Sequence, residues 1–210
     1  LTATTPPRTP SASSGATFEL VYLGALDRVR HIDFLLDVLA ENRRRQPDVD
    51  YRLCLVGAAS TAPEDDWLRD QIEARGLSPF VDRVGPLPRE QAWTRARRAQ
   101  LGVSAIPRGP VFDVSSPTKT VEYLTLGLPV VVNDIPDQAA VVAATGAGLC
   151  VPMAVDEFAQ AIVQARERHA ELQERAGAAR DWLLAHRGYD VLATRVDRAL
   201  REALRGGRRD

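Results

Sequence analysis

Residues 112–134 read FDVSSPTKTVEYLTLGLPVVVND, and this stretch decides how the rest of the chain is interpreted. It predicts a loop, a helix of about three turns, a tight turn and a buried strand. Ser116 is a favourable N-cap residue, and Pro117 suits the first helical position. Gly127 and the proline that follows it end the helix, and the valines at 130–132 are typical of a strand buried on both faces.

The first turn of this predicted helix carries Lys119 and no acidic residue before Glu122, although acidic residues would stabilise a helix start. Free N–H groups, the positive end of the helix dipole and a lysine together favour an anion, and phosphate is the usual one. Glu122 lies one turn later on the same face as Thr118 and Lys119, where its carboxylate could accept hydrogen bonds from two ribose hydroxyls. A solvated Lys–Glu pair that only stabilises the helix is the alternative interpretation.

The composition is that of a globular domain, because 45% of the 210 residues are hydrophobic and 26% are charged. The net charge of −1 gives no reason to expect a nucleic-acid partner. Cys54 and Cys150 lie in apolar runs and are predicted to be buried free thiols. With no membrane-spanning run and no signal-peptide pattern, we predict a cytoplasmic protein, and peripheral membrane attachment of a full-length protein stays open. The start at Leu1 favours a fragment of a longer chain.

Predicted strands alternate with predicted helices along the chain, which indicates an α/β fold with a doubly wound, mostly parallel, Rossmann-like sheet covered by helices on both faces. Such sheets bind ligands at the carboxyl ends of their strands. The predicted strands are 18–24, 51–57, 80–84, 101–106, 130–132 and 148–151, and the predicted helices are 31–45, 63–75, 89–99, the helix of the opening stretch, and 155–205 with an interruption near 187–188.

The predicted domain organisation is simple. Residues 1–16 are rich in Thr, Pro and Ser and are predicted to be a disordered tail or an interdomain linker. Residues 17–205 form one folded domain, of which 182–205 are a C-terminal helical extension, and 206–210 form a second tail. His169 and His186 in the helical region are predicted to face solvent.

A second basic helix start follows the first predicted strand. It contains Arg28, Arg30 and His31, although the helix dipole disfavours positive charge at this end of a helix. A shared anion would compensate for this placement, and arginines that lean into solvent are the alternative. Arg30 and Lys119 on opposite sides of a diphosphate would neutralise a leaving group without a metal, and no metal-ligand spacing is present. The sequence also lacks the Gly-x-Ser-x-Gly, Gly-x-Gly-x-x-Gly and Gly-Lys-Ser/Thr motifs.

Five short motifs occur in an order that resembles the C-terminal, donor-binding half of retaining GT-B glycosyltransferases of the family-four, or group 1, type. They are 22–24 (YLG) with Arg30 and Asp33, 55–57 (LVG), 84–90 (VGPLPRE), 116–119 (SPTK) with Glu122, and 127–131 (GLPVV). The resemblance covers residues 18–205. It implies a Rossmann-like domain that binds a nucleotide-diphosphate sugar, such as a UDP- or GDP-sugar, for metal-independent transfer of a hexose with no cofactor.

The resemblance also implies roles for individual residues. Arg30 matches a basic residue on the donor diphosphate, and Glu122 matches the glutamate that holds the ribose. The strand end at Val81, Arg83 and Val84 matches the segment that reads the base. The whole implied donor site is Gly24, Arg28, Arg30, Asp113, Ser116, Pro117, Thr118, Lys119 and Glu122, with Arg30 and Lys119 as the catalytic cations.

Two positions depart from the family pattern. Val114 stands where the first glutamate of a Glu-x7-Glu motif would be, with Asp113 as a possible substitute. Ala25 replaces an arginine, whose role Arg28 could share. The family also has an N-terminal domain that receives the acceptor, here an unknown glycan, lipid or small molecule, so we expect this piece to be inactive without that domain.

Three other functions remain open from the sequence. A non-catalytic module that binds a nucleotide sugar would explain Val114, and a sugar-nucleotide epimerase would share the two-domain architecture. A doubly wound domain of flavodoxin or receiver type that serves protein contacts is the third. Receivers need an acidic cluster after the first strand, where this chain has Gly24, Ala25 and Leu26.

Overall fold

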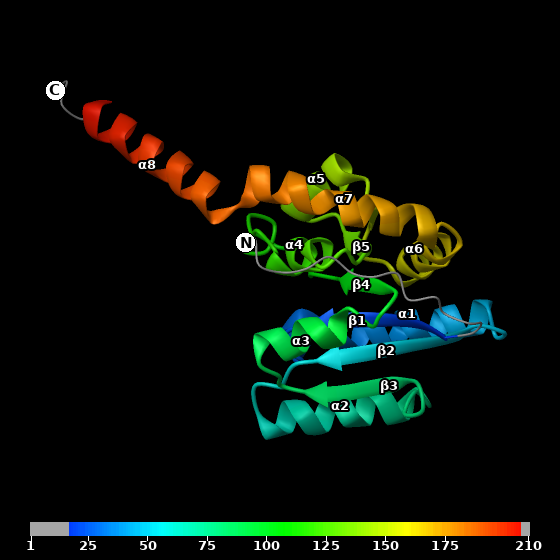
Figure 1. The fold of residues 1–210 in the computed structure, drawn as a ribbon. Helices are drawn as coiled ribbons and strands as arrows, with labels where there is room; N and C mark the ends of the chain where they lie inside the picture. The colour runs from blue at the N-terminus through cyan, green and yellow to red at the C-terminus, as the bar shows by residue number, and fades with distance from the viewer. Residues whose placement is uncertain (1–16, 207–210) are drawn as a thin grey trace.

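The computed structural model describes residues 17–206, so the predicted tails lie outside the described residues except for Gly206, which ends the last helix. Within this part, parallel strands form one six-stranded sheet in the order β3-β2-β1-β4-β5-β6 (Figure 1). The strands are β1 (Thr17–Leu23), β2 (Asp50–Val56), β3 (Val81–Gly85), β4 (Leu101–Ser104), β5 (Val130–Asn133) and β6 (Gly148–Val151). The predicted fold class and all the predicted strands are confirmed, with small differences at the strand ends.

Helices connect the strands and continue after the last one. They are η1 (Arg28–Arg30), α1 (Ile32–Arg45), α2 (Ala62–Ala74), α3 (Arg89–Ala96), α4 (Thr118–Thr125), α5 (Pro136–Thr145), α6 (Val155–Glu167), α7 (His169–Arg187) and α8 (Tyr189–Gly206). The sequence analysis missed α5 altogether. It also missed the break at Arg168 between α6 and α7, whereas the predicted interruption near 187–188 is confirmed.

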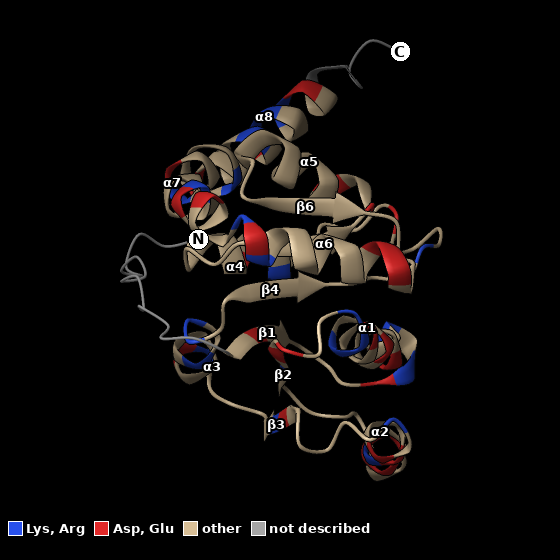
Figure 2. Cartoon of the chain, turned by 90° about the vertical axis from the view of Figure 1, so that its right-hand side faces the viewer, with Lys and Arg blue, Asp and Glu red and all other residues tan. Residues whose placement is uncertain are grey.

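The two faces of the sheet carry separate apolar cores, because successive residues of a strand point to opposite faces. Leu20 and Tyr22 of β1 belong to the core with α1, α2 and α6, whereas Val21 and Leu23 belong to the core with α3, α4, α5 and α7. Figure 2 shows the same division, with α1 and α2 on one side of the strands and α3 and α7 on the other. Because both faces are covered, the strands read as nearly continuous apolar runs.

The direction of strand order reverses between β1 and β4, which are neighbours in the sheet. Connections from β1 run to one side and connections from β4 to the other, so the loops after these two strands open away from each other. Arg30 follows β1 and Lys119 follows β4, so the two predicted basic helix starts flank this point of the sheet.

Four side chains whose surroundings were predicted from the sequence have specific positions in the fold. Both cysteines are free thiols, as expected, and Cys54 is buried as predicted, whereas Cys150 is only half-buried. Burial raises the pKa of the Cys54 thiol to about 12. The prediction that His169 faces solvent is wrong. Its Nε2 lies 2.9 Å from the carbonyl oxygen of Gln100, and its ring meets the Phe18 ring edge-on. His186 is exposed and stacks on Trp182.

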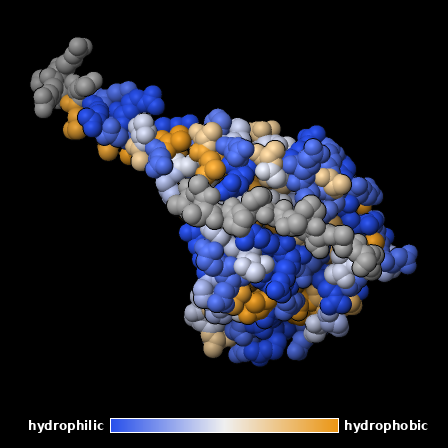
Figure 3. Space-filling model, in the orientation of Figure 1, coloured by the Kyte–Doolittle hydropathy of each residue, from blue (hydrophilic) through white to orange (hydrophobic). Residues whose placement is uncertain are grey.

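Helix α8 leaves the body of the domain after Gly188 (Figure 1). Its apolar residues recur on one face and are exposed, as the apolar patches along it in Figure 3 show. These residues are Tyr189, Leu192, Val196, Leu200 and Leu204. Over residues 17–206, the structure contains no helix with both the length and the apolar character required to cross a membrane.

Glycines end the first three strands and let them approach each other. The Gly24 N–H donates to the carbonyl of Val56, and the Gly57 N–H donates to that of Gly85, each at 3.0 Å. Gly57 has a φ of +152°, and a Cβ atom there would lie 1.8 Å from the carbonyl oxygen of Gly24. Since backbone cannot move aside as a flexible side chain can, position 57 requires glycine.

We expect Gly57→Ala to lower the free energy of unfolding by at least about 2 kcal/mol, because it combines backbone strain with a clash against backbone. Urea denaturation measures this change. Gly177→Ala is the matched control, since Gly177 lies in α7 with no atom within 4 Å of an added Cβ. That variant should gain about 0.5–1 kcal/mol from helix propensity. A tolerated Gly57→Ala would contradict the geometry of the strand ends.

Candidate functional site

The start of α4 differs from the prediction in one respect. Pro117 is the N-cap residue, and no side chain caps the helix. Ser116, predicted to be the cap, instead donates from its Oγ to Oδ2 of Asp137 at 2.8 Å. Asp137 also pairs with Arg187 at 2.7 Å. The first turn of α4 therefore keeps N–H groups without a side-chain acceptor, and it carries no acidic residue.

A buried polar network holds the start of α4 against the sheet. Gln138 accepts at Oε1 from the hydroxyls of Ser104 and Thr120, at 3.1 and 3.2 Å. Its Nε2 donates to the backbone oxygen and to Oδ1 of Asn133, both at 2.8 Å. Asn133 in turn bonds both backbone groups of Ile106. Because these polar groups are satisfied within the network, they fix the loop from β4 and the first turn of α4 to the end of β5.

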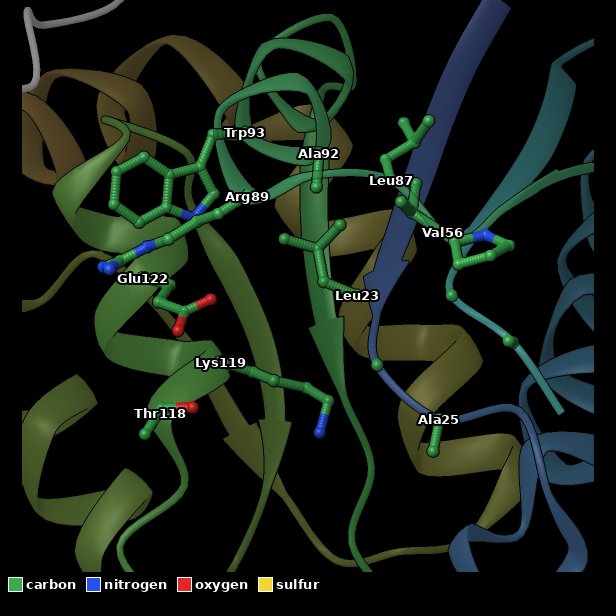
Figure 4. Close-up of a pocket in the computed structure, with 14 residues that line it drawn as sticks. Leu23, Ala25, Val56, Leu87, Arg89, Ala92, Trp93, Thr118, Lys119 and Glu122 are labelled. Carbon is green, nitrogen blue, oxygen red and sulfur yellow. The ribbon is translucent and has the colours of Figure 1, made fainter. Parts of the chain in front are cut away.

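A cleft of about 400 Å³ lies between the glycine-ended strands and α4. Figure 4 shows Lys119 reaching across it toward the end of β1, with Glu122 one turn further along α4. The opposite side comes from the segment after β3 and from α3. The residues that line the cleft are Leu23, Gly24, Ala25, Val56, Gly57, Ala58, Pro86, Leu87, Arg89, Ala92, Trp93, Thr118, Lys119 and Glu122.

Lys119 is the only lysine of the chain, and its ammonium group is held without an ion pair. Its Nζ lies over the ring of Tyr22, 5.1 Å from the centroid. None of the ion pairs among residues 17–206 includes Lys119. Burial lowers the pKa of Lys119, and the nearby positive charge of Arg30 lowers it further. An anion in the cleft would reverse both effects, because it would supply the missing counter-charge.

Arg30 lies close enough to lower the pKa of Lys119, but it is already paired. Its guanidinium contacts the carboxylate of Asp27, a buried side chain that also accepts from the Arg30 N–H at 3.0 Å. Arg28 points to α2, where it pairs with Glu64 and stacks over Trp67 at 5.0 Å. Carboxylates thus compensate for the arginines after β1, and Arg28 does not line the cleft.

Four of the nine predicted donor-site residues line the cleft, and Arg30 is not among them. Gly24, Thr118, Lys119 and Glu122 line it together. Asp113 lies on the loop before α4, where Arg108 donates to it at 2.7 Å. Ser116 and Pro117 form the entry to α4 beside the cleft. Of the predicted base-binding residues, Val81 and Val84 lie within β3, and Arg83 pairs with Asp65 beside a neighbouring cavity of about 460 Å³.

The sequence analysis did not single out Arg89 or Trp93 as site residues. Arg89 begins α3, and its guanidinium lies 4.1 Å from the centre of the Trp93 ring. The sequence did contain a signal for Arg89, because it is a cation at the start of a predicted helix, as Arg30 is. Pro86 and Leu87, which also line the cleft, follow the strand whose last residues were predicted to read the base.

Comparison with known proteins identifies the family. Residues 17–168 match the model of the family described as glycosyl transferases group 1, and the chain belongs to that family. A search among curated proteins found no match. The predicted resemblance to the C-terminal half of a GT-B glycosyltransferase is confirmed.

Solved structures share the fold at low sequence identity. Sucrose-phosphate synthase from Thermosynechococcus elongatus has a TM-score of 0.69 and 20% identity over 90% of this chain and 46% of its own. The pneumococcal O-GlcNAc transferase GtfA, in complex with UDP and GlcNAc, has a TM-score of 0.67 and 18% identity over 87% of this chain and 36% of its own. HepE from Anabaena, in complex with UDP and glucose, has a TM-score of 0.63 and 21% identity over 90% of this chain and 48% of its own. The chain spans less than half the length of each.

The isolated position of Lys119 allows its charge state to be measured directly. Reductive ¹³C-methylation labels this single lysine side chain, and the NMR signal can be followed with pH. We expect a pKa below the ordinary value of 10.5, because burial and Arg30 both disfavour the charged form. The same sample in urea is the control and should titrate in the ordinary range. A folded-state pKa equal to the denatured value would contradict the environment described for Lys119.

The two contacts of Asp137 predict its contribution to stability. We expect Asp137→Ala to lower the free energy of unfolding by about 1–2 kcal/mol, because Arg187 and Ser116 both lose a partner. Asp181→Ala removes an exposed carboxylate from α7 and should change stability by less than about 0.5 kcal/mol. Chemical denaturation compares the two variants. Equal stability of both would show that the Asp137 contacts contribute nothing.

Proposed function

We propose that this chain is the donor half of a glycosyltransferase and that its cleft binds a nucleotide-diphosphate sugar. The observation that supports this most is Lys119, a partly buried cation with no ion-pair partner, beside the uncapped first turn of α4. Together they present positive charge and free N–H groups to the cleft, which suits a diphosphate. Glu122 lies one turn further along α4 and lines the same cleft, where its carboxylate could accept hydrogen bonds from ribose hydroxyls.

The proposed chemistry is electrostatic and uses no metal. The bond between the sugar C1 and the diphosphate oxygen breaks, a bond from an acceptor hydroxyl to C1 forms, and that hydroxyl gives up its proton. Lys119 and Arg30 would stabilise the negative charge that develops on the departing diphosphate. Because Asp27 already holds Arg30, the donor would share this arginine with a buried carboxylate. Retention at C1 is proposed from the family resemblance.

UDP is the nucleotide we propose first. The structures of GtfA and HepE that share this fold were determined with UDP. A second domain would supply the acceptor site, and the exposed apolar face of α8 would then pack against it, as the family resemblance implies. The acceptor itself is proposed only as a hydroxyl compound.

One observation favours a second function, a module that binds a nucleotide sugar without transfer. Val114 stands where the family has a glutamate that contacts the sugar, and its side chain is 86% exposed on the loop before α4. Asp113 next to it is occupied by Arg108. Transfer by a longer chain that includes the acceptor domain, lost on Lys119→Met, would exclude this second function.

The test of donor binding is calorimetric titration of the chain with UDP, GDP, ADP and dTDP. We expect saturable binding of at least one nucleotide without added metal. Glu122→Ala should weaken it by about 1–3 kcal/mol, because the ribose hydroxyls lose their acceptor. Lys119→Met should weaken it at least as much, since charge-assisted hydrogen bonds are the stronger ones.

Arg69→Ala is the control for these variants, because Arg69 is a half-exposed arginine of α2 outside the cleft. It should bind as the unmodified chain does. Unchanged affinity in both Glu122→Ala and Lys119→Met would place the nucleotide elsewhere. Absence of binding by every nucleotide would overturn the proposed donor site.

A further inference from the structure

Arg89 and Trp93 form a flat surface at the end of the cleft opposite Lys119. The Arg89 guanidinium lies 4.1 Å from the centre of the indole ring, and Figure 4 shows the arginine running along that ring above Glu122. Trp93 is only 7% exposed, so the indole is fixed in the core, whereas Arg89 is exposed. The protein therefore presents the planar guanidinium, backed by a rigid ring, to the cleft.

No carboxylate competes for Arg89. None of the ion pairs among the described residues includes it, in contrast to Arg28 and Arg30, which are both paired with carboxylates. Arg89 is also the first residue of α3, a position where the helix dipole disfavours a cation. The stacking on Trp93 is thus the contact that holds the side chain where it is, and the outer face of the guanidinium stays available.

The order of groups along the cleft corresponds to the order of groups in a nucleoside diphosphate. Lys119, Glu122 and Arg89 follow each other in Figure 4, as a cation, a carboxylate and a planar surface. Beside Arg89 lies a smaller groove of about 140 Å³, whose other lining residues are Ser116, Thr118, Val121, Glu122, Arg187, Tyr189 and Leu192. The groove is mainly apolar, and it leaves open space beside the planar surface.

We propose that Arg89 binds the nucleobase of the donor by stacking, with Trp93 behind it. This assignment rests on the proposed function and names the residues for one part of that site. Stacking contacts the flat face of a base and not its hydrogen-bonding edge, so Arg89 would add affinity for any base. The proposed contact with the base lies at the start of α3, whereas the family resemblance predicted base contacts at the strand end formed by Val81, Arg83 and Val84.

The experiment compares UDP with inorganic pyrophosphate, which has the charge but no base. The chain and its variants are titrated with UDP by calorimetry, and pyrophosphate is measured by competition with UDP. We expect Arg89→Ala to weaken UDP binding about tenfold, the range found for loss of one stacking partner, and to change pyrophosphate binding by less than about twofold. Arg89→Lys keeps the charge but not the plane, so it should behave as Arg89→Ala does.

Arg98→Ala is the matched control, since Arg98 is an exposed arginine just after α3 and lines neither cavity. It should bind both ligands as the unmodified chain does. Equal losses for UDP and pyrophosphate in Arg89→Ala, or full UDP affinity in Arg89→Lys, would show that Arg89 acts by charge and overturn the proposal. Unchanged UDP binding in Arg89→Ala, together with a loss in Glu122→Ala, would overturn this inference alone. A chain that binds no nucleotide would overturn the proposed function and this inference together.

Discussion

The close approach of the first two strand ends is the constraint on which the cleft depends. Gly57 passes directly beneath the carbonyl oxygen of Gly24, where no Cβ atom fits. This contact brings the loops after β1 and β2 down to the level of the sheet, and so leaves space above them for α4 to present Lys119. Any larger residue would lift one loop into that space. The close approach of these two glycines therefore helps to shape the cleft, which both of them line.

The positive charge of Lys119 opposes the stability of the domain. Lys119 is partly buried without a counter-ion, and its pKa is lowered by that burial. A lysine whose folded-state pKa lies below its unfolded value binds fewer protons in the folded state, so stability rises with pH between the two values. At neutral pH the folded domain therefore carries an unfavourable charge. A side chain kept under such conditions is typical of a binding site, where the ligand supplies what the protein lacks.

The sequence predicts the parts of this structure that depend on local pattern. Apolar runs identified most of the six strands, although β3 (VDRVG) contains two charged residues, and the missing acidic residues at the start of α4 identified Lys119 and Glu122. Helix α5 was not predicted because its Ala- and Val-rich sequence has no clear amphipathic period. Ser116 failed as a cap because Asp137, in another helix, takes its hydroxyl. The position of Arg28 could not be predicted, since Glu64 lies far along the chain and meets Arg28 only in the fold. Arg30 pairs with Asp27, three residues before it, and this local pair was overlooked.

The same Asp137 connects the entry to α4 with the end of α7. One carboxylate oxygen accepts from Ser116 at the entry to α4, and the other pairs with Arg187, the last residue of α7. Gly188 follows, and α8 leaves the domain there. A shift of Arg187 would therefore pull on Asp137 and on the segment that leads into the first turn of α4. Tyr189 and Leu192 of α8 also line the groove beside Arg89, so the position of α8 affects the shape of this groove. The contacts of Asp137 therefore link the start of α8 to the start of α4.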